Sequence, residues 1–331
     1  MNKARYATSV FLTLMLFVSF AVIARSQSVS ELSEKYEPVF QKALDWLAAQ
    51  GEVKSVDPER EATLKTLDAP LLEPLAVQLP ATGRFFRARM AAFLQDFQQT
   101  NVASGAVVWK LYNHSVVIRS PEATIAIDLI SGMDRIAWDP ATLNKAISGI
   151  DVLLITHSHN DHADMRVVKK FIAAGKPVLA PPGLWESLPQ ASGITYIRDG
   201  EITIKNIRIT VFPSFQGMDP NNAYLVETTD GVRIMHIGDE GEKNATGKEW
   251  YARFKEPLHV DLLIPNCWSP NIDDLLRFVA PSAILPSHEF EITHFPSSRA
   301  TYDAIYSKYS KLNIPFFVSF WGEKLIIKAA R

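Results

Sequence analysis

The chain has 331 residues, of which 47% are hydrophobic and 21% are charged, a composition typical of a globular protein with a sizeable core. Its formal net charge is −2 at pH 7, so no overall basic charge favours binding to nucleic acid. Cys267 is the one cysteine, which excludes an intrachain disulfide framework and a zinc site built of thiolates.

The first 26 residues have the pattern of a signal peptide. Lys3 and Arg5 form a short positive region, and residues 10–23 are almost entirely apolar. Cleavage after Ala24 or Ser26 would place the mature chain in the periplasm or outside the cell. An uncleaved membrane anchor is the alternative, although the apolar stretch is shorter than the about 20 residues that a spanning helix needs.

Residues 27–104 are predicted to form a helical extension. Apolar residues repeat with helical spacing over 32–47 and again over 85–97. The intervening segment 57–79 is also predicted to be helical, with breaks near its prolines. We expect this extension to pack against the main domain, because amphipathic helices usually cover a core. A substrate cap and a membrane-facing surface are the alternatives.

From residue 105 to the end, short apolar runs alternate first with turns and later with helical segments, which predicts one α/β domain of two sheets with helices outside. The predicted strands are residues 107–112, 115–119, 123–128, 152–156, 177–180, 202–204, 207–212, 223–228, 232–237, 262–265, 283–286, 316–320 and 324–328. The predicted helices are residues 140–147, 165–174, 272–279 and 298–308.

A dense cluster of histidine and aspartate follows the predicted strand 152–156. Its members are His157, His159, Asp161 and His162. A strand that ends in such a cluster presents it from a rigid scaffold at a sheet edge. Imidazole and carboxylate together are ligands that zinc and similar divalent ions prefer. Two later predicted strands end in single residues of the same kind, Asp239 after a glycine and His288 shortly after a proline.

In order and separation, these three motifs resemble the metallo-β-lactamase-fold metal-dependent hydrolases. The first motif reads His-x-His-x-Asp-His, and Asp239 and His288 follow in the family's order. The resemblance covers residue 105 to the end and implies an αβ/βα sandwich with one or two divalent metal ions, zinc or another, in a cleft. It implies that His157 and His159 bind the first metal. Asp161, His162 and His288 would bind the second, and Asp239 would bridge the two ions together with a water.

The sequence departs from the family pattern at two positions. The family usually has a further histidine on the first metal, but no histidine occurs between His162 and His236. Gln216 stands where we align the missing ligand, with Phe215 as a rival for the position. A glutamine carbonyl is neutral and a poorer zinc ligand than imidazole, so the first site is expected to be weaker. Glu240 stands where a small hydroxyl residue is more usual, and either reaches the site or faces water.

Four residues are candidates for contacts with the substrate. Trp268 and His294 follow predicted strands near the presumed site and are candidates together with Gln216 and Glu240, although a tryptophan there is more often packing. Cys267 is expected to be buried. Three histidines without a matching partner motif are expected to be structural or surface residues: His114, His236 and His259.

The function predicted from these residues is that of an exported hydrolase with a small-molecule substrate. A zinc-type ion lowers the pKa of water to about 7, which supplies hydroxide for attack on an ester, lactone, amide or phosphodiester. Asp161 and Asp239 would act catalytically by holding the metals and orienting the nucleophile. One alternative is a binding protein that keeps the fold after losing activity. The other is a membrane-directed phosphodiesterase whose N-terminal helices contact lipid.

Overall fold

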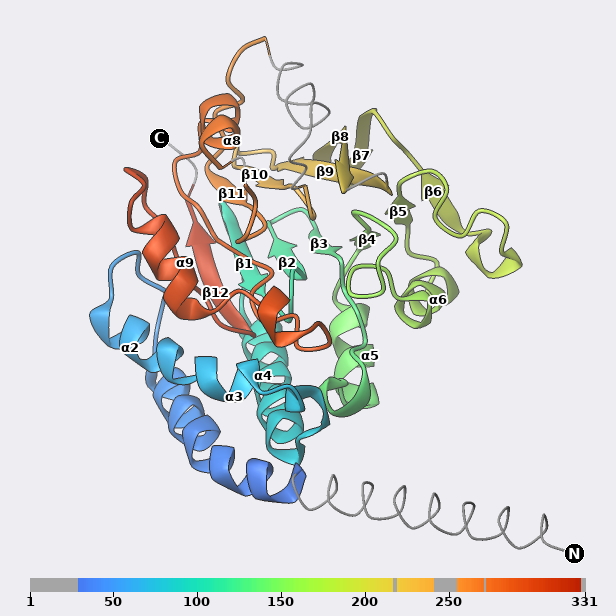
Figure 1. Cartoon of the computed structure of the whole chain (residues 1–331). Helices are drawn as coiled ribbons and strands as arrows, with labels where there is room; N and C mark the ends of the chain where they lie inside the picture. Colours follow the sequence, from blue (N-terminus) through green and yellow to red (C-terminus); the bar gives the residue numbers. More distant parts are fainter. Residues whose placement is uncertain (1–28, 217–218, 241–254, 271, 329–331) are drawn as a thin grey trace, which may run out of the picture.

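The computed structural model describes residues 29–216, 219–240, 255–270 and 272–328 (Figure 1). The predicted signal peptide lies outside the described residues. Among the helices of the described part, none is both long and apolar enough to cross a bilayer.

Two β-sheets face each other and form the centre of the molecule (Figure 1). The strands of the first sheet are β1 (Ala106–Lys110), β2 (Val116–Arg119), β3 (Thr124–Ile127), β4 (Val152–Leu154), β5 (Val178–Ala180), β6 (Ile194–Tyr196) and β12 (Glu323–Ile327). Those of the second are β7 (Gly200–Ile204), β8 (Ile207–Gln216), β9 (Asp219–Glu227), β10 (Arg233–His236) and β11 (Leu262–Ile264). Their orders are β12-β1-β2-β3-β4-β5-β6 and β11-β10-β9-β8-β7.

Helices cover the outer faces of both sheets. They are a helix over 29–49, α2 (Pro58–Thr66), α3 (Asp68–Leu72), α4 (Pro80–Gln99), α5 (Pro140–Ser148), α6 (Met165–Ala173), α8 (Ile272–Val279) and α9 (Tyr302–Tyr309). Single 3₁₀ turns are η1 (Ala76–Gln78), η2 (Asp134–Ile136), η3 (Pro189–Ala191) and η4 (Pro296–Ser298). One apolar cluster fills the space between the sheets, with Val108, Ile118 and Ile209 among its members, and a second joins the helices to the sheets. This is the predicted αβ/βα sandwich.

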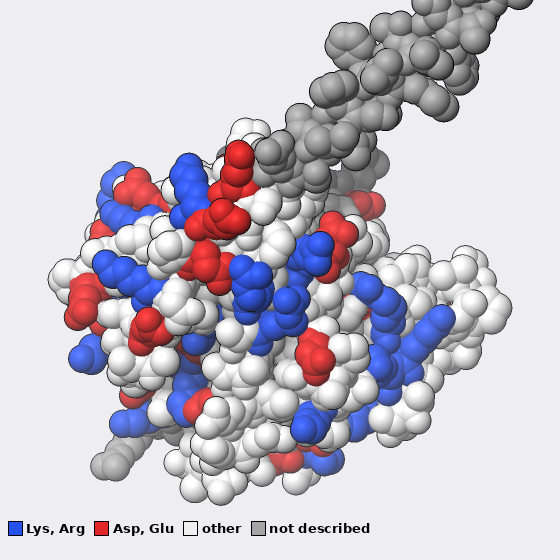
Figure 2. All heavy atoms as spheres, turned by 90° about the horizontal axis from the view of Figure 1, so that it is seen from below, with Lys and Arg blue, Asp and Glu red and all other residues white. Residues whose placement is uncertain are grey.

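The N-terminal helices share the second apolar cluster with the main domain. On α4, Phe86 packs edge-on against Trp321 and Phe93 against Trp109. Arg60 of α2 forms a buried ion pair with Glu323 of β12, with an Nη1–Oε2 distance of 2.6 Å. Figure 2 shows the face seen from below, where Lys and Arg side chains are interspersed with Asp and Glu, so that face carries no field of one sign.

The predicted helices and most predicted strands are present within a few residues of their expected ends. The predicted strands 283–286 and 316–320 are wrong as continuous strands, because Ile284 forms only single bridges with Leu263 and Phe316. Pro286 and Pro315 lack an N–H group and so interrupt a continuous ladder there. Strand β6, which sequence reasoning missed, has only one buried residue of three, so it lacks the apolar run that marks the equally short strands β4, β5 and β11.

The strand directions bring several chain segments to one edge of the sandwich. Strands β3 and β4 are parallel, so their carboxyl ends lie together, and the turn between antiparallel β1 and β2 lies at the same edge. In the second sheet the ends of parallel β10 and β11 meet the turn between β8 and β9. The candidate site is built on this edge.

Candidate metal centre

The first motif lies in a tight turn between β4 and α6. Two backbone hydrogen bonds close this turn, from the N–H groups of His162 and Ala163 to the carbonyl oxygen of His159, at 3.0 and 2.8 Å. Asp164 then caps α6 by accepting from the backbone N–H of Arg166. The turn therefore carries all four polar side chains of the motif to one place.

His162, His288 and Asp161 bring three ligand atoms together. The Nε2 atoms of the two histidines are 3.2 Å apart, and Oδ2 of Asp161 lies 3.3 Å from His162 and 3.4 Å from His288. All three residues are buried. Corners of a tetrahedron that lie about 2.0 Å from its centre are ~3.3 Å apart, so this spacing fits the ligand shell of zinc.

Asp239 completes this shell. Its carboxylate oxygens lie 3.4 Å from His162 Nε2 and 3.1 Å from His288 Nε2. The preceding Gly238 has φ +58°, and a Cβ there would lie 2.8 Å from Cβ of Thr156, so the close approach of the two sheets requires glycine. This explains the Gly-Asp pair seen in the sequence. We name His162, His288, Asp161 and Asp239 the inner set.

A second, looser group shares Asp239, and we name its other members, His157, His159 and Gln216, the outer set. His157 Nε2 lies 3.8 Å from Oδ2 of Asp239, and ligand atoms of His157, His159 and Asp239 all lie within 4.8 Å of one another. The side chain of His159 is 43% exposed. Gln216 donates from Nε2 to Oδ2 of Asp239 at 3.0 Å, so its side chain lies beside that carboxylate. The side chain of its rival, Phe215, lies outside the described part.

Unpaired buried atoms test whether these residues suit a metal. Within the described residues, His157 Nε2 and Gln216 Oε1 are buried and have no hydrogen-bond partner. Both are possible metal donors, and leaving such groups unpaired costs free energy in a folded protein. A cation between them and Asp239 would satisfy both, so the donor set fits a divalent ion in each group.

Asp128, at the end of β3, orients the ligands from behind. Its carboxylate contacts His162 Nδ1 at 2.8 Å and accepts from Thr156 Oγ1 at 2.6 Å. Thr156 Oγ1 in turn lies 3.0 Å from Nδ1 of His157. A carboxylate behind a ligating histidine fixes its tautomer and its direction. Sequence reasoning missed Asp128, although an aspartate directly after a strand at this edge was a usable signal.

Two histidines expected to be structural or surface residues lie buried beneath the inner set. His114, in the turn between β1 and β2, places Nδ1 3.4 Å from Oδ1 of Asp239. His236 stacks on it with ring centroids 4.1 Å apart, and its Nε2 contacts the His114 carbonyl oxygen at 2.9 Å. The pairing of the sheets creates the contact between His114 and Asp239, which no sequence motif indicated. His259 is exposed, in agreement with the expectation.

The charges of the inner set attract positive charge. Burial favours neutral imidazole, but the carboxylates of Asp239 and Asp161 together outweigh it and raise the pKa of His288 to about 10. Burial also opposes ionisation of Asp161, yet His162 and His288 hold the pKa of that carboxyl below its ordinary value. The pKa of His157, by contrast, is lowered by burial and by His162. A field that holds protons on the inner histidines equally favours a divalent cation in their place.

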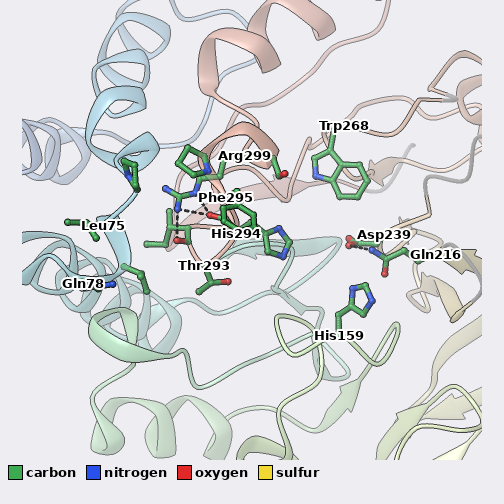
Figure 3. A pocket seen from close by; sticks show the side chains of 15 residues that line it. Leu75, Gln78, His159, Gln216, Asp239, Trp268, Thr293, His294, Phe295 and Arg299 are labelled. Carbon is green, nitrogen blue, oxygen red and sulfur yellow. Dashed lines mark hydrogen bonds between the residues drawn. The ribbon is translucent and has the colours of Figure 1, made fainter. Parts of the chain in front are cut away.

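A cleft opens over the ligand groups (Figure 3). His159, Gln216 and Asp239 line one end, and two of the predicted substrate contacts, Trp268 and His294, also line it. Glu240 is buried and is not among the described residues that line this cleft. Asn266 holds Asp239 by donating from Nδ2 to Oδ1 at 3.0 Å. Cys267 is buried as expected.

The comparisons with known proteins agree with this geometry. Residues 125–295 match a β-lactamase superfamily domain. A curated relative, protein Rv0786c of Mycobacterium tuberculosis, is 25% identical over 189 residues, which are 52% of this chain and 82% of the relative. An isothiocyanate hydrolase from Delia radicum gut bacteria has a TM-score of 0.53 at 16% identity, covering 68% of this chain and 100% of that one.

A further solved structure shows that this fold also serves other chemistry. CmlA, a diiron β-hydroxylase from Streptomyces venezuelae, has a TM-score of 0.51 at 14% identity, covering 79% of this chain and 63% of that one. Identities this low establish the fold alone. The matched domain, in contrast, spans just over half of the chain and includes most of the site. The chain therefore belongs to the β-lactamase superfamily and has the metallo-β-lactamase fold of that superfamily's metal-dependent hydrolases.

Proposed function

We propose that the protein is an exported metal-dependent hydrolase that adds water to an ester, lactone, amide or phosphodiester. One observation carries this proposal. The inner and outer sets share Asp239, which lies close to His162, His288 and His157, at the end of an open cleft of about 840 Å³, the size of a small-molecule site. Membership of the superfamily implies divalent metal binding, and the described clusters supply the donors for it.

The inner and outer sets would hold one ion each. A divalent ion bound there supplies Lewis acidity, which lowers the pKa of water and polarises the group under attack. His162, His288 and Asp161 would hold the inner ion, and His157, His159 and Gln216 the outer one. Asp239, at the boundary between the sets, would serve both.

The protein's own side chains would position the water and the substrate. Asp239 is fixed by the amide groups of Asn266 and Gln216, one on each carboxylate oxygen. A carboxylate held in this way would accept a hydrogen bond from a water molecule along one fixed direction. That hydrogen bond would turn a lone pair of the water oxygen toward the cleft. Asp161 is fixed similarly, because Asn113 donates to its Oδ2 at 2.9 Å.

Export is the part of the proposal that rests on sequence alone. The positive residues and the apolar run within residues 1–26 support a cleaved signal peptide. Expression in an exporting host and N-terminal sequencing test it. A mature chain that begins at residue 25 or 27 supports export, whereas one that begins at Met1 supports the anchor.

Hydrolysis is tested with protein loaded with Zn²⁺ or Mn²⁺ after chelation. We expect turnover of some member of a panel of neutral esters, lactones, amides and phosphodiesters, loss of turnover on chelation and recovery when metal returns. Asp239→Asn should lose both metal and turnover. Asp273→Asn, a change to an exposed residue of α8, should keep both. Full turnover in Asp239→Asn would refute the assignment.

Gln216 favours a second candidate function. A neutral amide beside Asp239 would weaken the outer site, as expected for a binding protein that has kept the fold and lost activity. Such a protein would bind metal in the inner set and turn over no member of the panel. Metal stoichiometry and turnover measured on the same preparation therefore separate the two functions.

A further inference from the structure

The cleft is longer than its metal end requires. Figure 3 shows His159, Gln216 and Asp239 at one end and Leu75 with Gln78 at the other. A volume of about 840 Å³ leaves space beyond the reacting group for most of a drug-sized molecule. The walls of this space should therefore select the substrate.

Apolar side chains from two distant parts of the chain form these walls. We name as the apolar arm the lining residues Pro74, Leu75, Val77, Ile292, Phe295 and Pro296. The first three precede α4 in the N-terminal helical part, and the others follow the ligand His288. The extension thus contributes one wall of the cleft, rather than serving only to cover the core.

Exposed aromatic side chains mark the same cleft. Phe295 is 83% exposed and Trp268 is 40% exposed, and both line it. Large apolar side chains left in water cost free energy, and those that gather in a cavity mark a ligand site. Trp268 lies at the metal end, with its ring centroid 5.4 Å from that of His288, so apolar surface flanks both ends of the cleft (Figure 3).

Arg299 lines the arm but offers no charge-assisted contact to a ligand. Its guanidinium has five N–H donors, and all are directed to backbone carbonyl oxygens. Nε and Nη2 donate to His294 at 2.9 and 2.7 Å, and Nη2 also donates to Ile292 at 2.9 Å. Nη1 donates to Leu71 and Glu73 at 2.7 and 2.9 Å. Arg299 therefore ties the two walls together and has no donor left for a phosphate or carboxylate.

The arm consequently favours uncharged groups. Among the described residues that line the cleft, Arg299 is the one Lys or Arg, and Asp239 at the metal end is the one Asp or Glu. An ionised group in the arm would lose water, and Arg299 would offer it no free N–H donor in return, so burying its charge there is costly. The free energy of binding of a hydrocarbon chain would become more favourable with each methylene group that it buries.

We propose that the apolar arm binds the hydrocarbon chain of an uncharged carbonyl substrate, an acyl ester or an alkyl-substituted lactone. This inference rests on the proposed function and selects the carbonyl class over phosphodiesters. Water adds to the acyl carbon and the ester C–O bond breaks. One water proton goes to the leaving alkoxide, and the other is lost from the acid that forms.

The test is a chain-length series on the metal-loaded full chain. The probes are the para-nitrophenyl esters of butanoate, hexanoate, octanoate and decanoate, with bis(para-nitrophenyl) phosphate as the phosphodiester. We expect kcat/KM to rise about two- to fourfold with each added methylene, by the transfer free energy of a buried methylene. No rise with length, or faster turnover of the phosphodiester than of every ester, would overturn the inference.

Phe295→Ser and Val56→Ser form a matched pair. Both side chains are about equally exposed, at 83% and 80%, so neither change threatens folding, but Val56 lies outside the cleft. Phe295→Ser should reduce the preference for decanoate over butanoate about tenfold. Val56→Ser should leave that preference unchanged, and Val77→Ser, on the opposite wall, should reduce it like Phe295→Ser. An unchanged preference in Phe295→Ser would overturn the inference.

A binding measurement separates this inference from the proposed function. Metal-free protein is titrated with the uncharged fluorophore N-phenylnaphthylamine, and decanol is used to displace it. Binding weakened about fivefold in Phe295→Ser but not in Val56→Ser, together with no turnover of any ester, lactone, amide or phosphodiester of the panel, would support the arm and refute the hydrolase. Turnover that is independent of chain length, with binding unaffected by Phe295→Ser, would support the hydrolase and refute the arm.

Discussion

The inner and outer sets share Asp239 but differ in almost every other respect. Atoms of His162, His288 and Asp161 lie 3.2 to 3.4 Å apart and are buried. In the outer set, His157 lies 3.8 Å from Asp239 and His159 is 43% exposed, with Gln216 in place of a third histidine. The inner set is preorganised for a metal, whereas the outer set opens to the cleft.

The difference follows from what supports each ligand. In the inner set, Asp128 holds His162 and the buried His114 contacts Asp239. The backbone of His288 has φ +74°, and its N–H group donates to the carbonyl oxygen of Asn113. A left-handed backbone costs free energy at a residue other than glycine, and such conformations cluster at functional sites. In the outer set, Nε2 of His159 lies 3.6 Å from a carboxylate oxygen of exposed Asp219. Buried support fixes geometry, while exposure leaves room for a substrate.

The difference in metal binding between the two sets should be largest when His162→Ala is compared with His159→Ala. We expect His162→Ala to weaken zinc binding by more than about 100-fold and to abolish turnover, because it also leaves Asp128 without its imidazole partner. His159→Ala should keep the inner ion. Zinc content measured by mass spectrometry, with circular dichroism as the folding control, checks both. Equal zinc content in His162→Ala and wild type would refute the inner set.

Asp128→Asn should weaken the inner site without removing a ligand. The change leaves an amide behind His162, which disturbs the tautomer of the histidine. We expect a 10- to 100-fold loss of zinc affinity, the range typical for partners of metal-bound histidines. Competition with a chromogenic chelator measures it. Ser131→Ala, outside the ligand groups, is the control, and an equal loss there would point to general destabilisation.

The buried His236 beneath the inner set should make the stability of the protein sensitive to acid. Burial lowers the pKa of His236 to about 3, below its unfolded value near 6.5, so the unfolded chain binds more protons between these pH values. Stability is therefore full above about pH 6.5 and is lost as pH falls, by about 2 kcal/mol at pH 5. Urea unfolding of metal-free wild type and His236→Gln checks this. Parallel curves from pH 7 to 5 would contradict it.

Gln216→His should make the outer set bind zinc more strongly, and so reduce its difference from the inner set. Imidazole is a better zinc donor than an amide, and Asp239 already lies 3.0 Å from the Gln216 side chain. We expect about tenfold tighter binding of the outer ion, or 1.4 kcal/mol, and a stoichiometry that rises towards two. Turnover is expected to rise or fall independently of this gain. Calorimetric zinc titration decides, and unchanged stoichiometry and affinity would mean that Gln216 is not the substitute ligand.

The sequence by itself determined the family and most of the candidate metal ligands. His157, His159, Asp161 and His162 lie within six positions, so one turn brings them together whatever surrounds it. The strands that carry Asp239 and His288 show a local apolar pattern, and strand direction places their ends at one edge. The departure at Gln216 was also visible, because a motif reveals which residue is missing.

Only the tertiary structure decided what surrounds those ligands. The roles of Asp128 and His114 depend on pairing between strands and between sheets, which no short pattern encodes. The apolar arm joins residues near 75 to residues near 295, and Arg299 ties them through backbone carbonyl oxygens that exist in every sequence. Local residue types select the metal chemistry, but the packing of distant segments shapes the cavity that selects the substrate.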